Sequence, residues 1–284
     1  MTWVYLDSGF IPAAEARVAA ADRALLYGHG LFETFRARRG AVYLLDRHLA
    51  RLKSGAQTLG IEPPAALSGL TAIVRELSER CGLADARVRL TLTAGAEHEQ
   101  PALLIQAQPV TGYPQILYDD GIAAVVATVR RNETSPLSGV KSLNYLDSLL
   151  ARQQARGAGA HEALLLNTIG RVAEGSATNV FIVQGDRLLT PPPEEGALPG
   201  ITRDAVLELA AKADLTPVEA PVTLADLRRA DEAFLTNAIA GLLPLVTIDG
   251  AAVGAGTPGA YTQSLHAIYQ HALNEARPPA PGSP

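Results

Sequence analysis

Short strand-like and helix-like segments alternate along most of this chain, and the alternation limits its possible folds more than any other feature. Residues 87–93 and 122–129 have the β-branched and apolar residues of strands, whereas residues 46–59 and 146–156 place apolar or small residues at helical spacing. Because such segments interleave on both sides of a break, we predict a mixed α/β (α+β) fold of two domains.

The break is a stretch rich in proline and glycine near residues 109–114. We expect an N-terminal α/β domain over residues 1–110, an interdomain linker over residues 111–118, and a C-terminal domain over residues 119–276. Residues 277–284 are rich in Pro, Gly and Ser, a composition that is typical of a disordered tail.

Charge and residue usage narrow the class of partner. A formal net charge of -5 gives no clustered positive surface for nucleic acid, and six dispersed histidines with one cysteine show no metal-ligand spacing. The first residues lack a basic region followed by an apolar stretch, so we expect no signal peptide. The sequence also has no run of about 18 apolar residues that could span a membrane. We therefore expect a cytoplasmic protein whose partner is a small molecule.

Lysine is scarce, and its three positions differ in context. Lys53 and Lys212 fall on predicted amphipathic helices and are interpreted as solvated surface residues. Lys141 instead follows a loop and precedes the Ser142–Tyr145 segment, where a helix begins. A lone lysine at a loop is weak evidence for chemistry, so its neighbours decide the interpretation.

Several segments accompany Lys141 in a fixed order. They are residues 27–34 (YGHGLFET), 46–52 (DRHLARL), 141–146 (KSLNYL), 174–181 (EGSATNVF) and 198–203 (LPGITR). Together they resemble the class IV aminotransferases, which are pyridoxal-phosphate enzymes of fold type IV, and the resemblance extends over about residues 3 to 275. It implies a two-domain fold like that of D-amino-acid aminotransferase, with the cofactor bound by the C-terminal domain. It also implies a homodimer.

The resemblance assigns roles around the cofactor ring. Lys141 holds pyridoxal 5'-phosphate as a Schiff base and, once displaced, moves the α-proton of the substrate. Glu174 lies at the pyridine nitrogen and keeps it protonated. Tyr145 lies beside the phenolic oxygen, and its spacing from Lys141 predicts that both share one helical turn.

The cofactor phosphate is assigned to three further segments. Arg51 is preferred to Arg47 as the phosphate-binding arginine. The amides of Ile201 and Thr202 follow a Pro-Gly turn at the start of a helix, which is a natural anion site, and the Thr202 hydroxyl can add to it. Asn237 and Ala238 contribute mainly backbone contacts.

The reaction is less constrained than the cofactor. Thr34 occupies the position of a catalytic threonine in 4-amino-4-deoxychorismate lyases, and the Asn237-Ala238 loop also resembles theirs, so we expect this lyase activity first. Ala94, where many lyases have arginine, and His29 depart from that pattern. A branched-chain or D-amino-acid aminotransferase is the alternative, and a non-catalytic pyridoxal-phosphate-binding protein is a third.

Overall fold

The computed structural model describes residues 2–275, and the tail predicted to be disordered lies outside the described residues. The chain divides into two compact units. The first comprises residues up to 111 together with 140–144 and the stretch from 273, and the second comprises residues 112–139 and 145–272. The mixed α/β fold with two domains is thereby confirmed.

An antiparallel six-stranded sheet forms the centre of the first unit's described residues, in the order β2-β1-β6-β5-β3-β4. Its strands are β1 (Trp3–Leu6), β2 (Gly9–Pro12), β3 (Gly30–Arg38), β4 (Ala41–Val42), β5 (Asp85–Thr93) and β6 (Leu103–Pro109). The helical segments are η1 (Ala13–Glu15), α1 (Arg23–Tyr27), α2 (Leu45–Leu59), η2 (Ala65–Gly69) and α3 (Leu70–Arg80).

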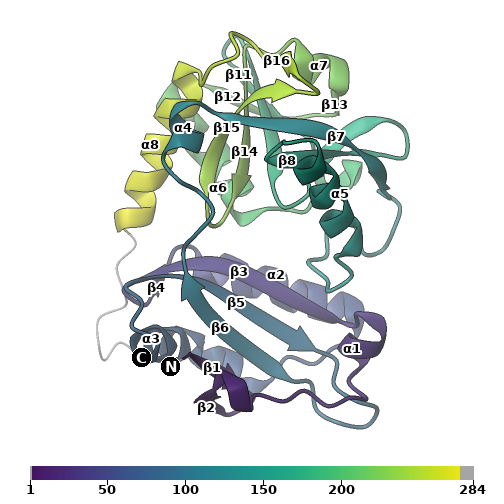
Figure 1. The fold of residues 1–284 in the computed structure, drawn as a ribbon, viewed down its shortest axis with the longest axis vertical. Helices are drawn as coiled ribbons and strands as arrows, with labels where there is room; N and C mark the ends of the chain where they lie inside the picture. Colours follow the sequence, from purple (N-terminus) through teal and green to yellow (C-terminus); the bar gives the residue numbers. More distant parts are fainter. Residues whose placement is uncertain (1, 276–284) are drawn as a thin grey trace. The chain divides into compact units, whose positions relative to one another are not determined.

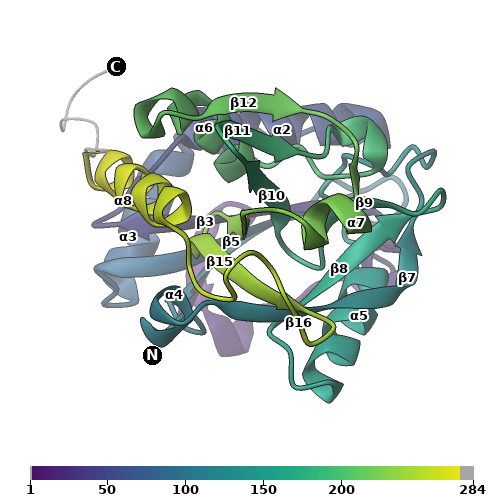
Figure 2. The ribbon, with the colours of Figure 1, turned by 90° about the horizontal axis from the view of Figure 1, so that it is seen from above.

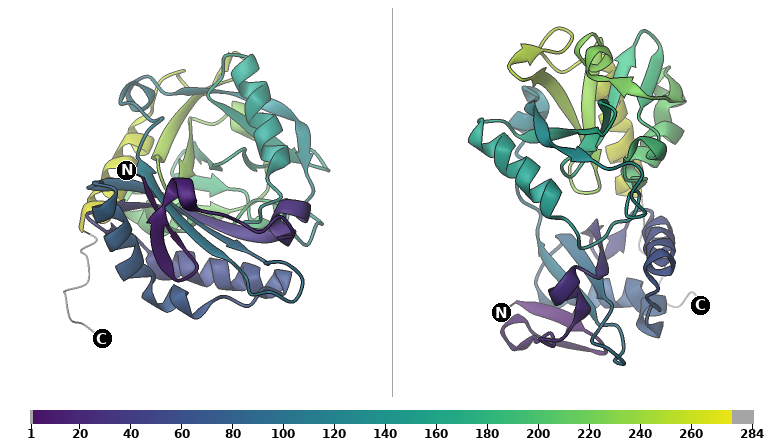
Figure 3. Two further views of the ribbon diagram at one scale, coloured as in Figure 1. Left: turned by 60° about the horizontal axis from the view of Figure 1, so that its bottom comes forward. Right: turned by 90° about the vertical axis from the view of Figure 1, so that its right-hand side faces the viewer.

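Helices α2 and α3 cover one face of this sheet (Figure 1 and Figure 3, left). Alternate residues of β3, including Leu31 and Phe35, pack with Leu52 of α2 and Val74 of α3 in the core. Gly55 of α2 allows a close approach to β3, because a Cβ there would lie 3.0 Å from Leu31 Cδ2. The intervening β3 residues, such as Phe32 and Thr34, belong to the opposite face.

The segment 140–144 joins the free edge of β3 although it is distant in sequence. The Phe32 amide donates to the Lys141 carbonyl at 3.0 Å, and the Leu143 amide donates to the Gly30 carbonyl at 2.9 Å. This pairing places Lys141 in the first unit. The second unit therefore differs from the C-terminal domain predicted over residues 119–276, because residues 140–144 and those from 273 belong to the first unit.

A mixed ten-stranded sheet forms the second unit's described part, in the order β12-β11-β10-β14-β15-β7-β8-β9-β13 with β16 beside β15. The strands are β7 (Ile122–Arg131), β8 (Glu162–Asn167), β9 (Arg171–Gly175), β10 (Asn179–Gln184), β11 (Arg187–Thr190), β12 (Thr216–Glu219), β13 (Val222–Thr223), β14 (Glu232–Asn237), β15 (Gly241–Ile248) and β16 (Ala251–Ala252). The helices are α4 (Ile116–Asp119), α5 (Leu146–Gly157), η3 (Pro193–Glu195), α6 (Ile201–Leu209), η4 (Ala210–Ala213), α7 (Leu224–Arg228) and α8 (Ala260–Glu275).

Helix α5 lies beside β7 and β8 (Figure 2). It packs through small residues, because Ala151 and Ala155 are fully buried in a cluster with Ala163 and Leu165 of β8. Its leucines Leu146, Leu149 and Leu150 remain exposed. Across residues 2–275, no helix combines the length and the apolar character that crossing a membrane requires.

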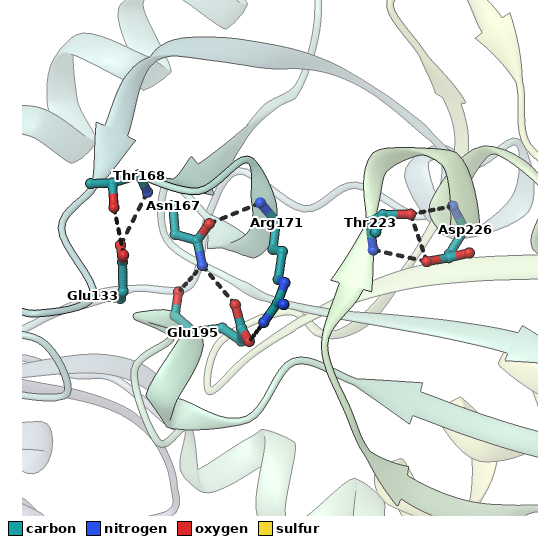
Figure 4. A network of polar contacts seen from close by, with 7 residues as sticks. All are labelled: Glu133, Asn167, Thr168, Arg171, Glu195, Thr223 and Asp226. Carbon is teal, nitrogen blue, oxygen red and sulfur yellow. Dashed lines mark hydrogen bonds and ion pairs between the residues drawn. The ribbon is translucent and has the colours of Figure 1, made fainter.

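Buried polar contacts fix the loop that leads into α6 (Figure 4). Asn167, at the end of β8, donates to Glu195 Oε2 at 2.7 Å, and Arg171 Nη1 donates to Glu195 Oε1 at 2.8 Å. A capping box between Thr223 and Asp226 starts α7 in the same view. The Glu195 contacts tie the loop to the β8–β9 hairpin, which also carries Glu174.

Candidate functional site

Lys141 lies at the edge of β3, with its side chain over an aromatic ring. Its Nζ is 4.4 Å from the centroid of the Phe32 ring, and the backbone pairing with Phe32 sets this approach. An ammonium group over a π face is a favourable contact, and the ring limits the directions that the amine can take. The lysine that carries the sequence motif is thus held by β3 and half-buried.

Arg89 on β5 lies against the same ring, and the motif comparison missed it. Its guanidinium carbon is 4.0 Å from the Phe32 centroid, and Arg89 is the register partner of Thr34. Directly opposed residues in an antiparallel pair share a face, so Thr34, Phe32 and Arg89 lie on the same side of the sheet. The alternation of residues 87–93 places Arg89 on the face opposite to Val88 and Leu90, but only the pairing of β5 with β3 brings it to the Phe32 ring.

Arg51 is joined to a buried carboxylate on the other face of β3. Its Nε donates to Glu33 Oε1 at 2.8 Å and its Nη2 donates to Glu33 Oε2 at 2.7 Å. His48 Nδ1 donates to Glu33 Oε2 at 2.8 Å. The helical spacing of His48 and Arg51 on α2 directs both side chains at Glu33. The preference for Arg51 over Arg47 as the phosphate-binding arginine stays a prediction.

Electrostatics fix the charges in this group. Burial favours a neutral Glu33, but the charge of Arg51 and the hydrogen bonds from His48 and Arg51 outweigh it and lower the pKa of Glu33 to about 2. Burial also lowers the pKa of His48, despite the attraction of Glu33. Glu33 and Arg51 are therefore an ion pair at neutral pH, and His48 is neutral.

Glu174 lies within β9 and is buried. Its Oε2 accepts a hydrogen bond from the Leu198 amide at 2.8 Å, and its Oε1 is 3.3 Å from Arg131 Nε. Arg131 was not singled out in the sequence. Its positive charge favours the ionised form of the carboxylate that Glu174 contributes.

Tyr145 does not share a helical turn with Lys141, so that prediction is wrong. Helix α5 begins at Leu146 with Tyr145 as its N-cap, and Lys141 is in the extended segment paired with β3. The Tyr145 hydroxyl donates to the Ser176 carbonyl at 2.8 Å. Burial raises the pKa of Tyr145 to about 12, so the phenol keeps its proton.

The N-terminus of α6 has the features of an anion site. Gly200 is its N-cap and provides no side-chain cap, and Ile201 and Thr202 are buried in the first turn. A side chain at Gly200 would not fit, because its Cβ would lie 2.0 Å from Asn179 Oδ1. Thr202 Oγ1 lies 3.3 Å from the Tyr269 hydroxyl. First-turn amides without a capping side chain suit a phosphate.

Asn237 is the last residue of β14, and Ala238 begins the turn that leads to β15. Asn237 Oδ1 accepts hydrogen bonds from the amides of Ile239 and Ala240 at 2.9 and 2.8 Å, so its side-chain oxygen maintains the turn. Immediately before it, Thr236 Oγ1 is buried with no hydrogen-bond partner in the described part of the chain. A buried hydroxyl of this kind fits a polar ligand group.

These donors fit pyridoxal phosphate, the cofactor that the sequence resemblance implies. Within the first unit Lys141 carries an amine, and within the second unit Glu174 carries a buried carboxylate and the start of α6 has amides without a capping side chain. Each of these groups is of a kind that this cofactor requires. Lys141, Thr34 and Arg51 belong to the first unit, whereas Glu174, Tyr145, Ile201, Thr202, Asn237 and Ala238 belong to the second.

Comparisons with known proteins agree with this chemistry. The family described as amino-transferase class IV matches residues 30–248. A putative branched-chain-amino-acid aminotransferase of Methanocaldococcus jannaschii is 39% identical over 271 residues, which are 92% of this chain and 93% of that protein. The aminodeoxychorismate lyase of Bacillus subtilis is 29% identical over 277 residues, 94% of this chain and 93% of that one.

A solved structure shows the same fold. The branched-chain amino acid aminotransferase of Thermoproteus uzoniensis with norvaline superposes with a TM-score of 0.87 at 32% sequence identity. The similarity covers 96% of this chain and 95% of that one.

Proposed function

The chain belongs to the class IV aminotransferase family, and from this premise we propose that it transfers the amino group of an α-amino acid to a keto acid. The observation that carries this choice is the arrangement of Lys141 and Arg89 on the Phe32 ring. An α-amino acid bears its amino group and its carboxylate on one carbon. Arg89 offers a guanidinium for that carboxylate, on the same ring as Lys141, whose amine the substrate's amino group would replace.

Pyridoxal 5'-phosphate is the cofactor of this family and of this chain. When bound, it supplies an electron sink that makes the α-hydrogen of an amino acid acidic. Lys141 Nζ would hold the cofactor and, with a substrate bound, would accept and return the proton at the substrate's α-carbon. The Phe32 ring restricts the amine to the side of the sheet on which Arg89 lies.

The remaining residues hold the cofactor in one orientation. Glu174, whose Oε1 is 3.3 Å from Arg131 Nε, would lie at the pyridine nitrogen and favour its protonated form. Tyr145, as a neutral phenol, would lie beside the phenolic oxygen.

The cofactor phosphate receives a second set of donors. Arg51 supplies a guanidinium, and the amides of Ile201 and Thr202 with the Thr202 hydroxyl supply the helix terminus. Backbone groups of Asn237 and Ala238 complete the set, which agrees with the use of the Asn237 side chain inside its own turn.

Arg89 is the group that we assign to the substrate carboxylate. A guanidinium binds a carboxylate through two parallel hydrogen bonds, and Arg89 lies on the face of β5 that also presents Thr34. This assignment replaces the arginine that is absent at Ala94.

The test supplies L- and D-amino acids one at a time as amino donors, each with 2-oxoglutarate as the acceptor. The keto acid formed from each donor is measured. Turnover with at least one donor, lost in Lys141→Ala, supports the proposal. A loss in Arg89→Leu that appears mainly as a raised KM supports the carboxylate role. A fully loaded enzyme that produces no keto acid from any donor argues against transamination.

Elimination of pyruvate from 4-amino-4-deoxychorismate is the second candidate, and Thr34 favours it. The Thr34 hydroxyl lies on the same sheet face as Phe32 and opposite Arg89, where it can relay a proton to a leaving group. Formation of 4-aminobenzoate that falls in Thr34→Val, with amino-donor turnover absent, selects this reaction.

We also propose that the protein is a homodimer. Each unit exposes large apolar side chains: Leu25, Leu26 and Tyr27 on α1, and Leu146, Leu149 and Leu150 on α5. The α5 leucines follow helical spacing and form one stripe. Contiguous exposed apolar residues of this kind mark a protein interface.

A further inference from the structure

We propose that Glu33 is a positioning residue that fixes the guanidinium plane of Arg51 for the cofactor phosphate. The inference rests on the proposed role of Arg51 and extends it to a carboxylate on the neighbouring strand. Glu33 lies on the core face of β3, where only 1% of it is exposed. A carboxylate is a costly choice for a core position, which apolar residues fill elsewhere on this face.

The contacts determine which edge of Arg51 can meet an anion. Glu33 accepts from Nε and Nη2, which fork onto its two oxygens at 2.8 and 2.7 Å. A phosphate bound by Arg51 therefore cannot use Nε or the Nη2 hydrogen that faces Glu33. Because the Glu33 backbone belongs to the central part of β3, the direction of that edge is set by the sheet.

His48 fixes Glu33 in turn. A carboxylate only accepts hydrogen bonds, so His48 carries its proton on Nδ1 and donates it to Glu33 Oε2. With His48 neutral, Glu33 and Arg51 balance each other's charge before a phosphate arrives. Glu33 therefore adds no attraction for a phosphate. Its contribution is that the flexible arginine side chain is ordered in advance.

Shortening the carboxylate separates orientation from charge. In Glu33→Asp the charge remains, but the side chain is one methylene shorter and cannot keep both arginine contacts and the His48 contact. The holoenzyme is stripped and titrated with pyridoxal phosphate and, separately, with pyridoxal, which has the same ring and aldehyde without the phosphate. Asp85→Glu is the matched control, because it changes the reach of another carboxylate that pairs with an arginine of β3, Arg36.

We expect Glu33→Asp to raise the Kd of pyridoxal phosphate about tenfold, because an Arg51 that is no longer held loses one charge-assisted hydrogen bond to the phosphate. The Kd of pyridoxal should not change. Asp85→Glu changes neither. An equal rise in the Kd of both ligands shows that Glu33 has a merely structural role, and it overturns the inference. An unchanged Kd for pyridoxal phosphate in the folded variant also overturns it.

Arg51→Met distinguishes failure of the inference from failure of the proposed function. If it leaves the affinity for pyridoxal phosphate intact, Arg51 does not bind the phosphate, whatever Glu33 does. If it weakens that affinity alone, the double variant Glu33→Asp/Arg51→Met loses nothing further, because Glu33 acts through Arg51. Should Glu33→Asp not fold, His48→Gln tests the same chain of contacts. A smaller loss restricted to pyridoxal phosphate supports the inference, and equal losses for both ligands contradict it.

Discussion

Lys141 is the residue on which the chemistry depends, and its replacement separates binding from catalysis. We predict that Lys141→Ala lowers turnover by about 10³-fold or more, since it removes both the covalent link and the group that moves the proton. The yellow absorption of the lysine-bound cofactor should disappear. Mass spectrometry after borohydride reduction checks the link, and a labelled peptide without Lys141 would contradict the assignment.

Glu33 gives a prediction that is independent of the cofactor. Its pKa of about 2 in the folded chain lies below the unfolded value of about 4.3, so Glu33 stabilises the fold above pH 4.3, and this stabilisation is lost as the pH falls toward 2. By about pH 3 the loss is on the order of 2 kcal/mol.

The measurement compares chemical unfolding of the unmodified protein with that of Glu33→Gln between about pH 6 and pH 3. The unmodified protein should lose about 2 kcal/mol more over this interval than the variant, which lacks the titrating carboxylate. Parallel stability curves for the two proteins would show that the Glu33 pKa is not depressed.

Single residues also show where prediction from sequence ends. Lys141, Glu174 and Arg51 were selected from their motifs, and the structure gives each a defined surrounding. Arg89 and Arg131 were missed because their roles arise only when strands pair or side chains meet across the fold. The interpretation of Tyr145 was also wrong. The helix begins at Leu146, as predicted, but Lys141 lies in the extended segment that pairs with β3, a long-range contact that local spacing cannot show.

At the scale of elements, the segment 140–144 depends on Gly30. A Cβ at Gly30 would lie 2.7 Å from both Leu143 Cδ1 and the Leu92 carbonyl oxygen, so a side chain there pushes against both neighbours of β3. We predict that Gly30→Ala destabilises the fold by about 1–3 kcal/mol, as overpacking does, and loosens the Lys141 segment.

Gly9→Ala is the control for Gly30→Ala, because nothing lies within 4 Å of a Cβ at Gly9 in β2. Its effect should stay within about 0.5 kcal/mol. Urea unfolding measures the stability of both variants, and hydrogen exchange of the Leu143 amide reports the segment itself. Equal stability of the two variants would show that the close approach at Gly30 is unimportant.

The periodicity of the sequence predicted most of the boundaries of the helices and strands. It did not predict which strands and segments pair with one another. The helix predicted over residues 46–59 is α2, and the strand predicted over residues 87–93 lies within β5. The pairing of residues 140–144 with β3 joins positions about a hundred residues apart, which local patterns cannot indicate. The same applies to the contact of α2 with the buried carboxylate of β3.

For the whole molecule, the exposed leucines of α5 predict self-association. Replacing Leu149 with Glu places a charge in the exposed stripe without disturbing the packed face of Ala151 and Ala155. We expect sedimentation to show a dimer for the unmodified protein and a shift toward monomer for Leu149→Glu. Lys53→Glu, on an exposed part of α2, is the control and should leave the dimer intact. A monomer in both cases contradicts the proposed homodimer.

Transamination converts the bound cofactor to its amine form, so the identity of the cofactor after reaction with an amino donor tests the proposed function. The loaded enzyme is mixed with one amino donor without any keto acid, and the cofactor is then released and identified. The proposed function predicts one equivalent of pyridoxamine phosphate and one of keto acid per site, with neither product in Lys141→Ala. Recovery of unchanged pyridoxal phosphate with every donor, together with catalytic formation of 4-aminobenzoate from 4-amino-4-deoxychorismate, would contradict it and identify a lyase.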